Sequence, residues 1–451
     1  MRHVTGLLPP IFCAPIRWCS KKTCTTGNEH GGKPSDGDII TPWNVTAAGP
    51  KGVDYDRVLT RFKSKRVDEA LLAQLQEMCD GAVAMIGEGR AEKLHHFFRR
   101  GIVFSHRDFD LALHKMHSAN KVGVGATTYL YTGRGPSTRS MHLGHVVPFL
   151  LAKYLQDTFG LPLVIQITDD EKHLFRDIPL HPGDGPEAGV ESHGDLVEEN
   201  IKDIIAFGFD RRRTFIFRNT TYMGTMYPTV VRLQRTLTLS AAKHTLGLKD
   251  SDNVGKAAFP ATQAAPCCSD VFPEVLSRRP GDAPLQCIVP CAIDQDPFFV
   301  LARASAARLK FPPPALLHTK FLPALKGLKY KMSSSNEANG VIKLRDEPHK
   351  VKEKIRKAFS GGCGTLSDMQ SKGVDLSVDV AYQFIRFFSP SDELFEEVTA
   401  KYSSGKMNSA QVKELASEVV LQHILSDWQE RRKCVTEGDV RNFTSVRSIV
   451  I

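Results

Sequence analysis

A lysine in a short serine-rich stretch is the first residue with an evident chemical use. The stretch KMSSS, Lys331 to Ser335, is followed by the polar, loop-like sequence NEANG. A loop with a single cation beside several hydroxyl groups suits an anion that is bound transiently. The simpler alternative is a solvent-exposed loop lysine. KMSSS therefore predicts an anion site with Lys331 as its cation.

A second set of chemically useful residues lies in TGRGPSTRSMHLGH, which begins at the end of the strand-like TTYLYTG. Gly133 and Gly135 allow a ligand to approach the backbone closely, and the helix predicted to follow presents N–H groups to a phosphate. His142 and His145 can face the same anion from its first turn, and Gly144 leaves room for a flat ring. HLGH alone is a short pattern, and such histidines could also be solvated or cap neighbouring groups.

The elements expected to position these residues are buried strands that alternate with helices. Short β-branched or aromatic runs are typical of strands buried on both faces. They occupy residues 127–133, 161–170, 214–219, 285–294 and 316–323. The stretch VEENIKDIIAFGFD has the spacing of a helix with one apolar face, and Gly208 is suited to cap its end. This alternation predicts a Rossmann-like, doubly wound parallel sheet that binds ligands at the carboxyl ends of its strands.

After about Val341 the pattern changes to helix upon helix, which predicts a C-terminal all-α domain. In SAQVKELASEVVLQHILSDWQERRK an apolar stripe runs along one face, and basic residues crowd the end. The stripe consists of Val412, Leu415, Ala416 and Val419, and the basic residues are Arg431, Arg432 and Lys433. These cations predict a basic edge on the helical domain.

The composition is that of a folded protein with a polyanionic partner. The chain has 451 residues and a formal net charge of +9, which favours a polyanion through charge steering and counterion release. No apolar run approaches the ~18 residues of a membrane span, so no membrane association is expected. The 10 cysteines are scattered without the paired CxxC spacing of a zinc site, so no structural metal is expected.

The first residues form a basic, hydroxylated and acid-poor segment. It contains Arg2, Arg17, Lys21 and Lys22, and its first acidic residue is Glu29. This composition resembles an organellar transit peptide, although three prolines interrupt the amphipathic helix that such peptides usually form. The sequence thus favours import into the mitochondrial matrix, with a disordered tail on a cytoplasmic protein as the alternative.

The two motifs together resemble HIGH and KMSKS, the signature motifs of class I aminoacyl-tRNA synthetases. The resemblance extends to KGVDYDRVLTRF, HHFFRRGIVFSHRD, YLYTGRGPS, LPLVIQITDDEKHLF, FPATQAAP and VPCAIDQDPFF. The chain is therefore similar, from about Thr41 to its end, to eukaryotic-type tryptophanyl-tRNA synthetases, and its first segment favours an organellar form.

The resemblance implies an ATP site in which Lys331 stabilises departing pyrophosphate. Its catalytic residues would be Lys331, His142, His145 and Arg134. Its ATP-binding residues would be Gly133, Gly135, His142, Gly144, His145, Lys331, Met332, Ser333, Ser334 and Ser335. The carboxylate of tryptophan would attack the α-phosphate of Mg-ATP, and tRNA(Trp) would then accept the amino acid from the adenylate.

A tryptophan pocket needs an acceptor for the indole N–H inside an apolar cavity. Tyr131 and Gln166, at or near neighbouring strand ends, match the family's indole-reading positions. Glu171, Gln263 and Gln295 match its residues for the amino acid's ammonium group. Phenylalanine would leave buried acceptors unpaired, at roughly 1–3 kcal/mol apiece. The related tyrosyl enzymes typically place an acidic partner where Gln166 stands.

The resemblance also divides the chain into segments. Residues 1–40 would be a transit peptide or disordered, and residues 41–127 an extension that packs on the catalytic domain. The catalytic domain, with a dimerisation insertion, would span residues 128–335 and the helical anticodon-binding domain residues 336–434. The last segment, residues 435–451, could return to the catalytic domain. A homodimer is expected, as in the family.

Two departures from the family pattern affect the expected function. Ser334 replaces the second lysine of KMSKS, so Lys331 would carry the charge of the loop alone. Cys363 and Gly364 stand where cytosolic relatives usually have an Arg-Asp pair near the anticodon. With a transit peptide, this suggests relaxed reading of the first anticodon base, so that UCA is accepted as well as CCA. The alternative is drift in a surface loop.

Three other functions compete with tryptophan activation. A tyrosyl-tRNA synthetase would share the fold and both motifs. A silent RNA-binding or signalling protein would keep the fold, but it would need neither HLGH nor Lys331. A different nucleotidyltransferase could share the HxGH element but would have no use for the KMSSS loop or the helical domain.

Overall fold

The structure is a computed structural model, and it describes residues 37–86, 94–122, 127–176, 178, 180, 193–333, 340–361 and 374–450. The basic segment up to residue 36 lies outside this range, and so do four of the predicted site residues. These are Ser334, Ser335, Cys363 and Gly364.

A seven-stranded sheet contains all five predicted strands, and they are parallel to one another. Their bounds are β5 Thr128–Arg134, β6 Leu163–Ile167, β7 Thr214–Arg218, β8 Gln286–Ala292 and β9 Ala315–Thr319. The order across the sheet is β3-β4-β9-β8-β5-β6-β7. The chain thus builds outward from β5 to β7 and then crosses back to β8 and β9. The prediction of a doubly wound sheet is confirmed.

The sheet opens between β5 and β8, where the strand order reverses. β5 pairs with β8 over Thr128 to Leu130, whereas it pairs with β6 from Leu130 to Arg134. The carboxyl end of β5 therefore has a neighbour on one side only. Ligands of doubly wound sheets bind at this switch point, because backbone groups from two diverging strands face the same crevice.

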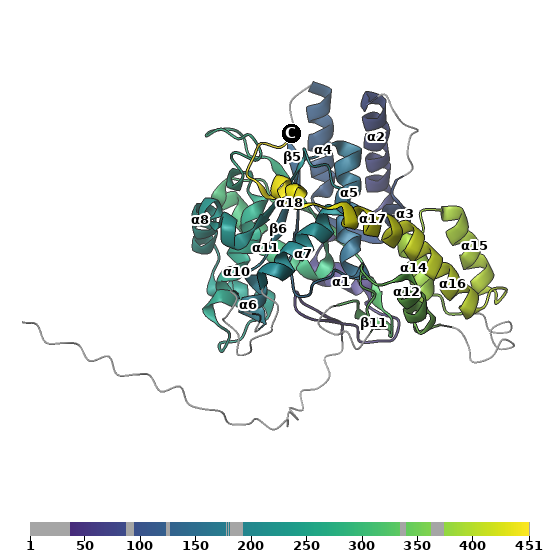
Figure 1. Cartoon of the computed structure of the whole chain (residues 1–451). Helices are drawn as coiled ribbons and strands as arrows, with labels where there is room; N and C mark the ends of the chain where they lie inside the picture. The colour runs from purple at the N-terminus through teal and green to yellow at the C-terminus, as the bar shows by residue number, and fades with distance from the viewer. Residues whose placement is uncertain are drawn as a thin grey trace, which may run out of the picture. The chain divides into compact units, whose positions relative to one another are not determined.

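Two hydrophobic clusters cover the faces of the sheet. Leu130 and Ile165 point into one cluster, and Tyr131 and Val164 point into the other, as the alternation of a strand requires. The helices on the first face include α5 Leu143–Phe159 and α7 His193–Ile205, and those on the second include α8 Asn219–Thr236, α10 Val254–Ala264 and α11 Asp296–Leu309. Figure 1 shows α8, α10 and α11 gathered together in teal.

Two features of the sheets were not predicted. β4 Val103–Arg107 and β3 Lys65–Arg66 extend the main sheet in the antiparallel sense beyond β9. A separate small sheet joins β1 Ile39–Ile40, β2 Val45–Thr46, β10 Pro323–Ala324 and β11 Gly327–Lys331. Lys331 is the last residue of β11, so the KMSSS stretch leaves this small sheet rather than the main one.

The chain after residue 341 is helical within the described residues, as predicted. Its helices are α12 Pro348–Arg356, α14 Val380–Phe388, α15 Asp392–Ser403, α16 Ser409–Val420, α17 Ser426–Cys434 and α18 Glu437–Thr444. Helix α16 packs against both α12 and α14 (Figure 1). The chain end then returns to the part of the chain that carries the main sheet, because Val450 N–H donates to the carbonyl of Arg212 at 2.8 Å and Ile449 N–H donates to that of Val275 at 2.9 Å.

The predicted basic edge at the end of α17 is wrong for one of its three residues. Arg432 forms ion pairs with Glu199 and Asp203 of α7, at 3.0 and 2.9 Å. Its guanidinium group therefore holds the helical part against α7 instead of facing a polyanion. Arg431 donates to the carbonyl of Ala206 at 2.7 Å and is exposed.

Candidate active site

A cavity of about 240 Å³ lies at the switch point of the sheet. Its walls come from the carboxyl ends of β5, β8 and β9, from the first turn of α5 and from the start of the KMSSS stretch. Most of the predicted residues line it: Gly133, Arg134, Gly135, His142, Gly144, His145, Glu171, Gln263, Gln295, Lys331, Met332 and Ser333. The structure therefore brings HLGH and KMSSS to one site, although about 190 residues separate them.

The KMSSS stretch approaches the HLGH turn through Gly144. A Cβ atom at this position would lie 3.1 Å from the carbonyl oxygen of Met332, closer than nine in ten such contacts. A glycine therefore lets the two motifs approach without displacing either of them. Pro42 and Trp43 line another part of the cavity, and Trp43 stacks on Phe175 at a ring distance of 3.9 Å.

The first N–H groups of α5 are used inside the protein, contrary to the expectation that they face a phosphate. Leu143 N–H donates to the carbonyl of Ile342 at 3.0 Å, and Gly144 N–H donates to Nδ1 of His142 at 3.1 Å. The segment that follows the KMSSS loop thus caps the helix from outside. Anion binding in this turn consequently depends on side chains.

His142 presents a donor to the cavity. Burial, followed by the charge of Arg134, keeps the pKa of His142 and of His145 well below the usual range, so both imidazoles are neutral at pH 7. Since Nδ1 of His142 accepts from Gly144, its proton sits on Nε2. This Nε2 is buried and has no partner among the described residues. A phosphate oxygen would satisfy it.

Arg134 is the second donor without a full set of partners. Its Nη1 lies 2.9 Å from Nε2 of His145, and its Nε donates to the side chain of Asn200 at 3.1 Å. Its Nη2 is buried without a partner among the described residues. Burial lowers the pKa of Arg134 to about 10, so the guanidinium stays charged at pH 7. A buried, incompletely paired cation is stabilised by an anionic ligand.

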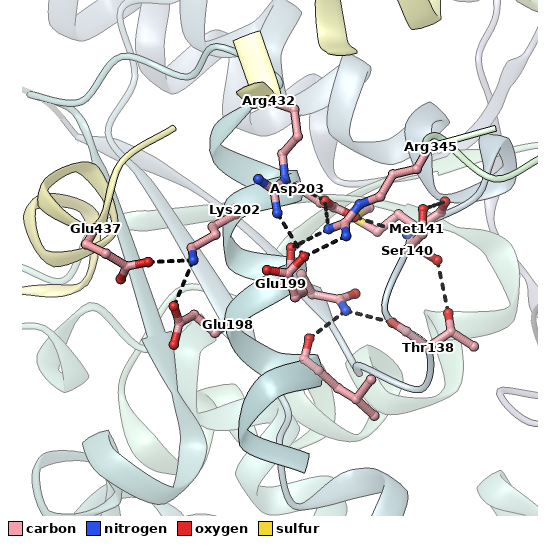
Figure 2. Close-up of polar contacts among 12 residues, drawn as sticks. Thr138, Ser140, Met141, Glu198, Glu199, Lys202, Asp203, Arg345, Arg432 and Glu437 are labelled. Atoms are coloured by element: carbon pink, nitrogen blue, oxygen red, sulfur yellow. Dashed lines mark hydrogen bonds and ion pairs between the residues drawn. The ribbon is translucent and has the colours of Figure 1, made fainter. Parts of the chain in front are cut away.

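Helix α7 contacts the segment just before HLGH through the buried carboxylate of Asp203 (Figure 2). Asp203 accepts from the backbone N–H of Met141 at 3.2 Å and from Arg345 at 2.6 Å. It also accepts from Arg432 at 2.9 Å. One side chain therefore ties the residue before HLGH to the segment after KMSSS and to the helical part of the chain.

Lys331 is held by a carboxylate that the sequence did not single out. Its Nζ forms an ion pair with Asp294, which follows β8. The other oxygen of Asp294 is buried without a partner among the described residues. The ammonium also lies 5.6 Å from the ring centre of Phe321. Asp294 and Phe321 fix Lys331 at the edge of the cavity.

Glu171 is ionised within the cavity. Burial acts to raise its pKa, but the ammonium of Lys172 at 2.5 Å and the hydroxyl of Thr168 at 2.7 Å bring it below the usual range. A Cβ atom at Gly135 would collide with the Glu171 carboxylate. The glycine thus leaves room for this carboxylate in its present position. Glu171 can accept from a cationic ligand group such as an ammonium.

Tyr131 and Gln166 lie behind the cavity wall. Both are fully buried, and neither lines the cavity. The Tyr131 hydroxyl donates to Oε1 of Gln166 at 2.5 Å and accepts from Nε2 of Gln263 at 2.8 Å. Gln166 in turn donates to Asn219 at 2.8 Å. Of this group, Gln263 alone faces the cavity, so an indole N–H can reach Tyr131 and Gln166 only if Gln263 moves aside.

Four residues of the site were missed by the sequence reading: Trp43, Lys172, Asn200 and Asp294. Lys172 and Asp294 stand in LPLVIQITDDEKHLF and VPCAIDQDPFF, so their position after a strand was a usable signal. Asn200 had no such signal, because it reaches Arg134 from a helix 66 residues away in sequence.

Metal and membrane features are not found in the described part of the chain. No group of three or more His, Cys, Asp or Glu side chains there could hold a metal ion. None of its helices combines the length and the apolar character needed to cross a bilayer.

Comparisons with known proteins identify the family to which this chain belongs. Residues 281–424 match the family of tRNA synthetases class I (W and Y). The cytoplasmic tryptophan–tRNA ligase of Homo sapiens is 40% identical over 440 residues, which cover 95% of this chain and 87% of the human protein. That of Dictyostelium discoideum is 40% identical over 413 residues, 91% of this chain and 96% of its own. A crystal structure of the Encephalitozoon cuniculi tryptophanyl-tRNA synthetase bound to tryptophan superposes with a TM-score of 0.74, at 37% identity, over 88% of this chain and 99% of that one.

The doubly wound sheet, with HLGH and KMSSS at its switch point, defines a class I aminoacyl-tRNA synthetase. The relatives that match this chain over nearly its whole length all act on one amino acid, tryptophan. The chain belongs to the tryptophanyl-tRNA synthetases of eukaryotic type, which are tryptophan–tRNA ligases.

Proposed function

We propose that the switch-point cavity activates tryptophan with ATP and that the chain then transfers it to tRNA(Trp). The observation that carries this proposal is the convergence of donors on one cavity. Nε2 of His142 and Nη2 of Arg134 are buried without partners in the described part of the chain, and the ammonium of Lys331 lies on the same cavity. Such an arrangement suits the phosphates of Mg-ATP.

In the first step a carboxylate oxygen of tryptophan attacks the α-phosphorus of ATP. A new O–P bond forms, the bond from that phosphorus to the bridging oxygen breaks, and pyrophosphate leaves with the electron pair. No protein nucleophile is needed, because positioning and charge stabilisation supply the catalysis. His142 and Arg134 hold the phosphates. Lys331 leaves its ion pair with Asp294 and stabilises the negative charge that develops on pyrophosphate. In the second step a ribose hydroxyl of the terminal tRNA adenosine attacks the adenylate, and AMP leaves.

Tryptophan is recognised by the group formed by Tyr131, Gln166 and Gln263. When Gln263 turns toward the ammonium of the substrate, the Tyr131 and Gln166 oxygens become acceptors for the indole N–H. Glu171 and Gln295 line the cavity and contribute to binding of the ammonium. Tyrosine is disfavoured, since Gln166 stands where the tyrosyl enzymes typically place an acidic partner for the hydroxyl of the substrate.

We expect amino-acid-dependent ATP–pyrophosphate exchange with tryptophan and not with tyrosine or phenylalanine. Phenylalanine would leave these acceptors unpaired, at roughly 1–3 kcal/mol each, and the hydroxyl of tyrosine would lack the acidic partner that the tyrosyl enzymes typically supply. The measurement uses the purified chain without tRNA and tests the three amino acids separately. Exchange with tyrosine would mean that the pocket is misread. A folded protein that binds ATP and shows no exchange would instead favour the silent RNA-binding alternative.

The helical part, residues 336–434, is proposed to hold the anticodon of tRNA(Trp), and the chain to work as a homodimer. Both proposals rest on family membership. The mass of the purified chain by light scattering checks the dimer, and a monomer would contradict it.

The chain is further proposed to be a mitochondrial enzyme with relaxed reading of the first anticodon base. Support comes from the basic, acid-poor start of the sequence and from Cys363 and Gly364. The relatives named above are cytoplasmic proteins, and a cytoplasmic location is the alternative. Transcripts with CCA and UCA anticodons are expected to be charged at similar rates. A strong preference for CCA would refute the relaxed reading.

A further inference from the structure

A second cavity of about 180 Å³ lies beside the first and belongs to none of the roles above. Its walls come from the segment before and at the start of α1 Tyr55–Phe62, from the hairpin of β10 and β11, and from α14. Lys320, Phe321 and Lys331 line both cavities. The second cavity is therefore a neighbour of the ATP site, with the KMSSS lysine between them.

The charged side chains that line this second cavity are all cationic. Five cationic side chains line it, and no aspartate or glutamate does. They are Lys51, Lys320, Lys329, Lys331 and Arg386. Two of the five have a carboxylate partner outside this lining, since Lys331 pairs with Asp294 and Lys51 lies 3.7 Å from Asp375. Cations that face one recess without an acid repel one another, so an anion would stabilise them.

Two of these cations are the least compensated. Lys320 and Arg386 have no carboxylate within ion-pair distance among the described residues. The ammonium of Lys320 lies 5.1 Å from the ring centre of Tyr55, and Arg386 donates to the carbonyl of Arg100 at 2.6 Å. Burial, followed by the charge of Arg386, lowers the pKa of Lys320 to about 8, and burial lowers that of Arg386. The charge of Arg386 thus destabilises that of Lys320.

We propose that this second cavity binds a compact polyanion and that its ligand is the inorganic pyrophosphate released from the ATP site. The inference rests on the proposed function, since adenylate formation produces this anion. Lys331 would stabilise pyrophosphate as it leaves the α-phosphate, and Lys320 and Arg386 would then hold it on the far side of Lys331. The step is non-covalent and changes no bond.

The shape of the recess favours a small anion over an RNA backbone. Apolar side chains separate the cations and limit its size: Val45, Val53, Phe321, Leu328 and Phe387 all line it. Phe387 and Val45 are buried, and Arg386 is partly buried in the same wall. A phosphodiester strand needs a surface groove along which several phosphates lie in line, whereas pyrophosphate needs only clustered donors.

Calorimetric titration of the full-length chain with inorganic pyrophosphate tests this proposal without catalysis. The first cavity is filled beforehand with Mg-ATP and tryptophanamide, whose amide cannot attack the phosphate. We expect one pyrophosphate to bind per chain under these conditions. Lys320→Gln and Arg386→Gln should each weaken this binding about tenfold or more, since each removes a charged donor. Orthophosphate should bind more weakly, because it carries fewer charges.

The matched control is Lys326→Gln, which removes an exposed lysine of the same hairpin that lines neither cavity. It should leave the affinity unchanged. Circular dichroism shows whether each variant is folded. If Arg386→Gln does not fold because it loses the hydrogen bond to Arg100, Lys320→Gln alone tests the proposal. The proposal is overturned if filling the first cavity abolishes pyrophosphate binding, if orthophosphate binds equally well, or if tRNA displaces pyrophosphate and itself binds more weakly to Arg386→Gln. Exchange with tryptophan tests the proposed function separately, so the two can fail independently.

Discussion

Replacing Lys331 with alanine is expected to lower the rate of tryptophan-dependent pyrophosphate exchange about 10²- to 10³-fold, while the KM for tryptophan changes little. The reason lies in the position of its ammonium. Lys331 is paired with Asp294 and lines the same cavity as His142 and Arg134, so it meets the charge that develops on the leaving pyrophosphate. Ser334 supplies no second cation to the loop. A loss confined to the chemical step is the mark of transition-state stabilisation.

The structure offers a way to separate lost catalysis from a disturbed site. In Lys331→Ala the carboxylate of Asp294 stays buried and loses its ion pair, which adds an unfavourable negative charge beside the phosphates. The double variant with Asp294→Asn removes that charge and should recover part of the loss. Lys326→Ala, on the same hairpin, is the control and should retain full activity. Equal losses in exchange rate and in tryptophan affinity would contradict the proposed role of Lys331.

The parallel sheet could be predicted because its strands are buried on both faces and read as continuous apolar runs. The strands that were missed carry no such signal. β4 contains Ser105 and His106, which are buried but polar. Ser105 Oγ lies 2.8 Å from Nδ1 of His318 on β9, and this pairing satisfies a group that composition alone would place in solvent. The small sheet includes strands of two residues, too short for any periodicity.

Most residues of the site that the sequence identified lie in short motifs at strand or helix ends. HLGH and KMSSS mark such ends directly, and their meeting follows from the fold class. Their supports could not be found in this way, because Asp294 and Asn200 act on residues distant in sequence. The same reason explains the misread basic edge. Whether Arg432 faces solvent or α7 depends on tertiary packing, which a helical pattern does not encode.

Replacing Asp203 with alanine is expected to lower the free energy of unfolding by about 3–5 kcal/mol. Burial raises the pKa of Asp203 even though two guanidinium groups lie beside it, so the charged cluster is not a large net source of stability. Removal of the Asp203 carboxylate alone is nevertheless destabilising, because its buried partners remain. It would leave Arg345 and Arg432 with Glu199 as their shared partner, and it would free the N–H of Met141. Urea unfolding measures the difference.

The position of Asp203 extends this expectation to activity. Its three partners are Met141, which precedes HLGH, Arg345, which follows the KMSSS loop, and Arg432 of α17 (Figure 2). At a temperature where the variant stays folded, we expect Asp203→Ala to raise the KM for ATP more than the KM for tryptophan. Glu198→Ala is the matched control, because it removes a carboxylate of the same helix from a more exposed pair with Lys202 at 2.9 Å. Such pairs contribute about 0–1 kcal/mol. If the two variants lost equal stability and neither changed the KM for ATP, the effect of Asp203 would be no larger than that of a surface carboxylate. Asp203 would then not be what holds the HLGH and KMSSS segments in position.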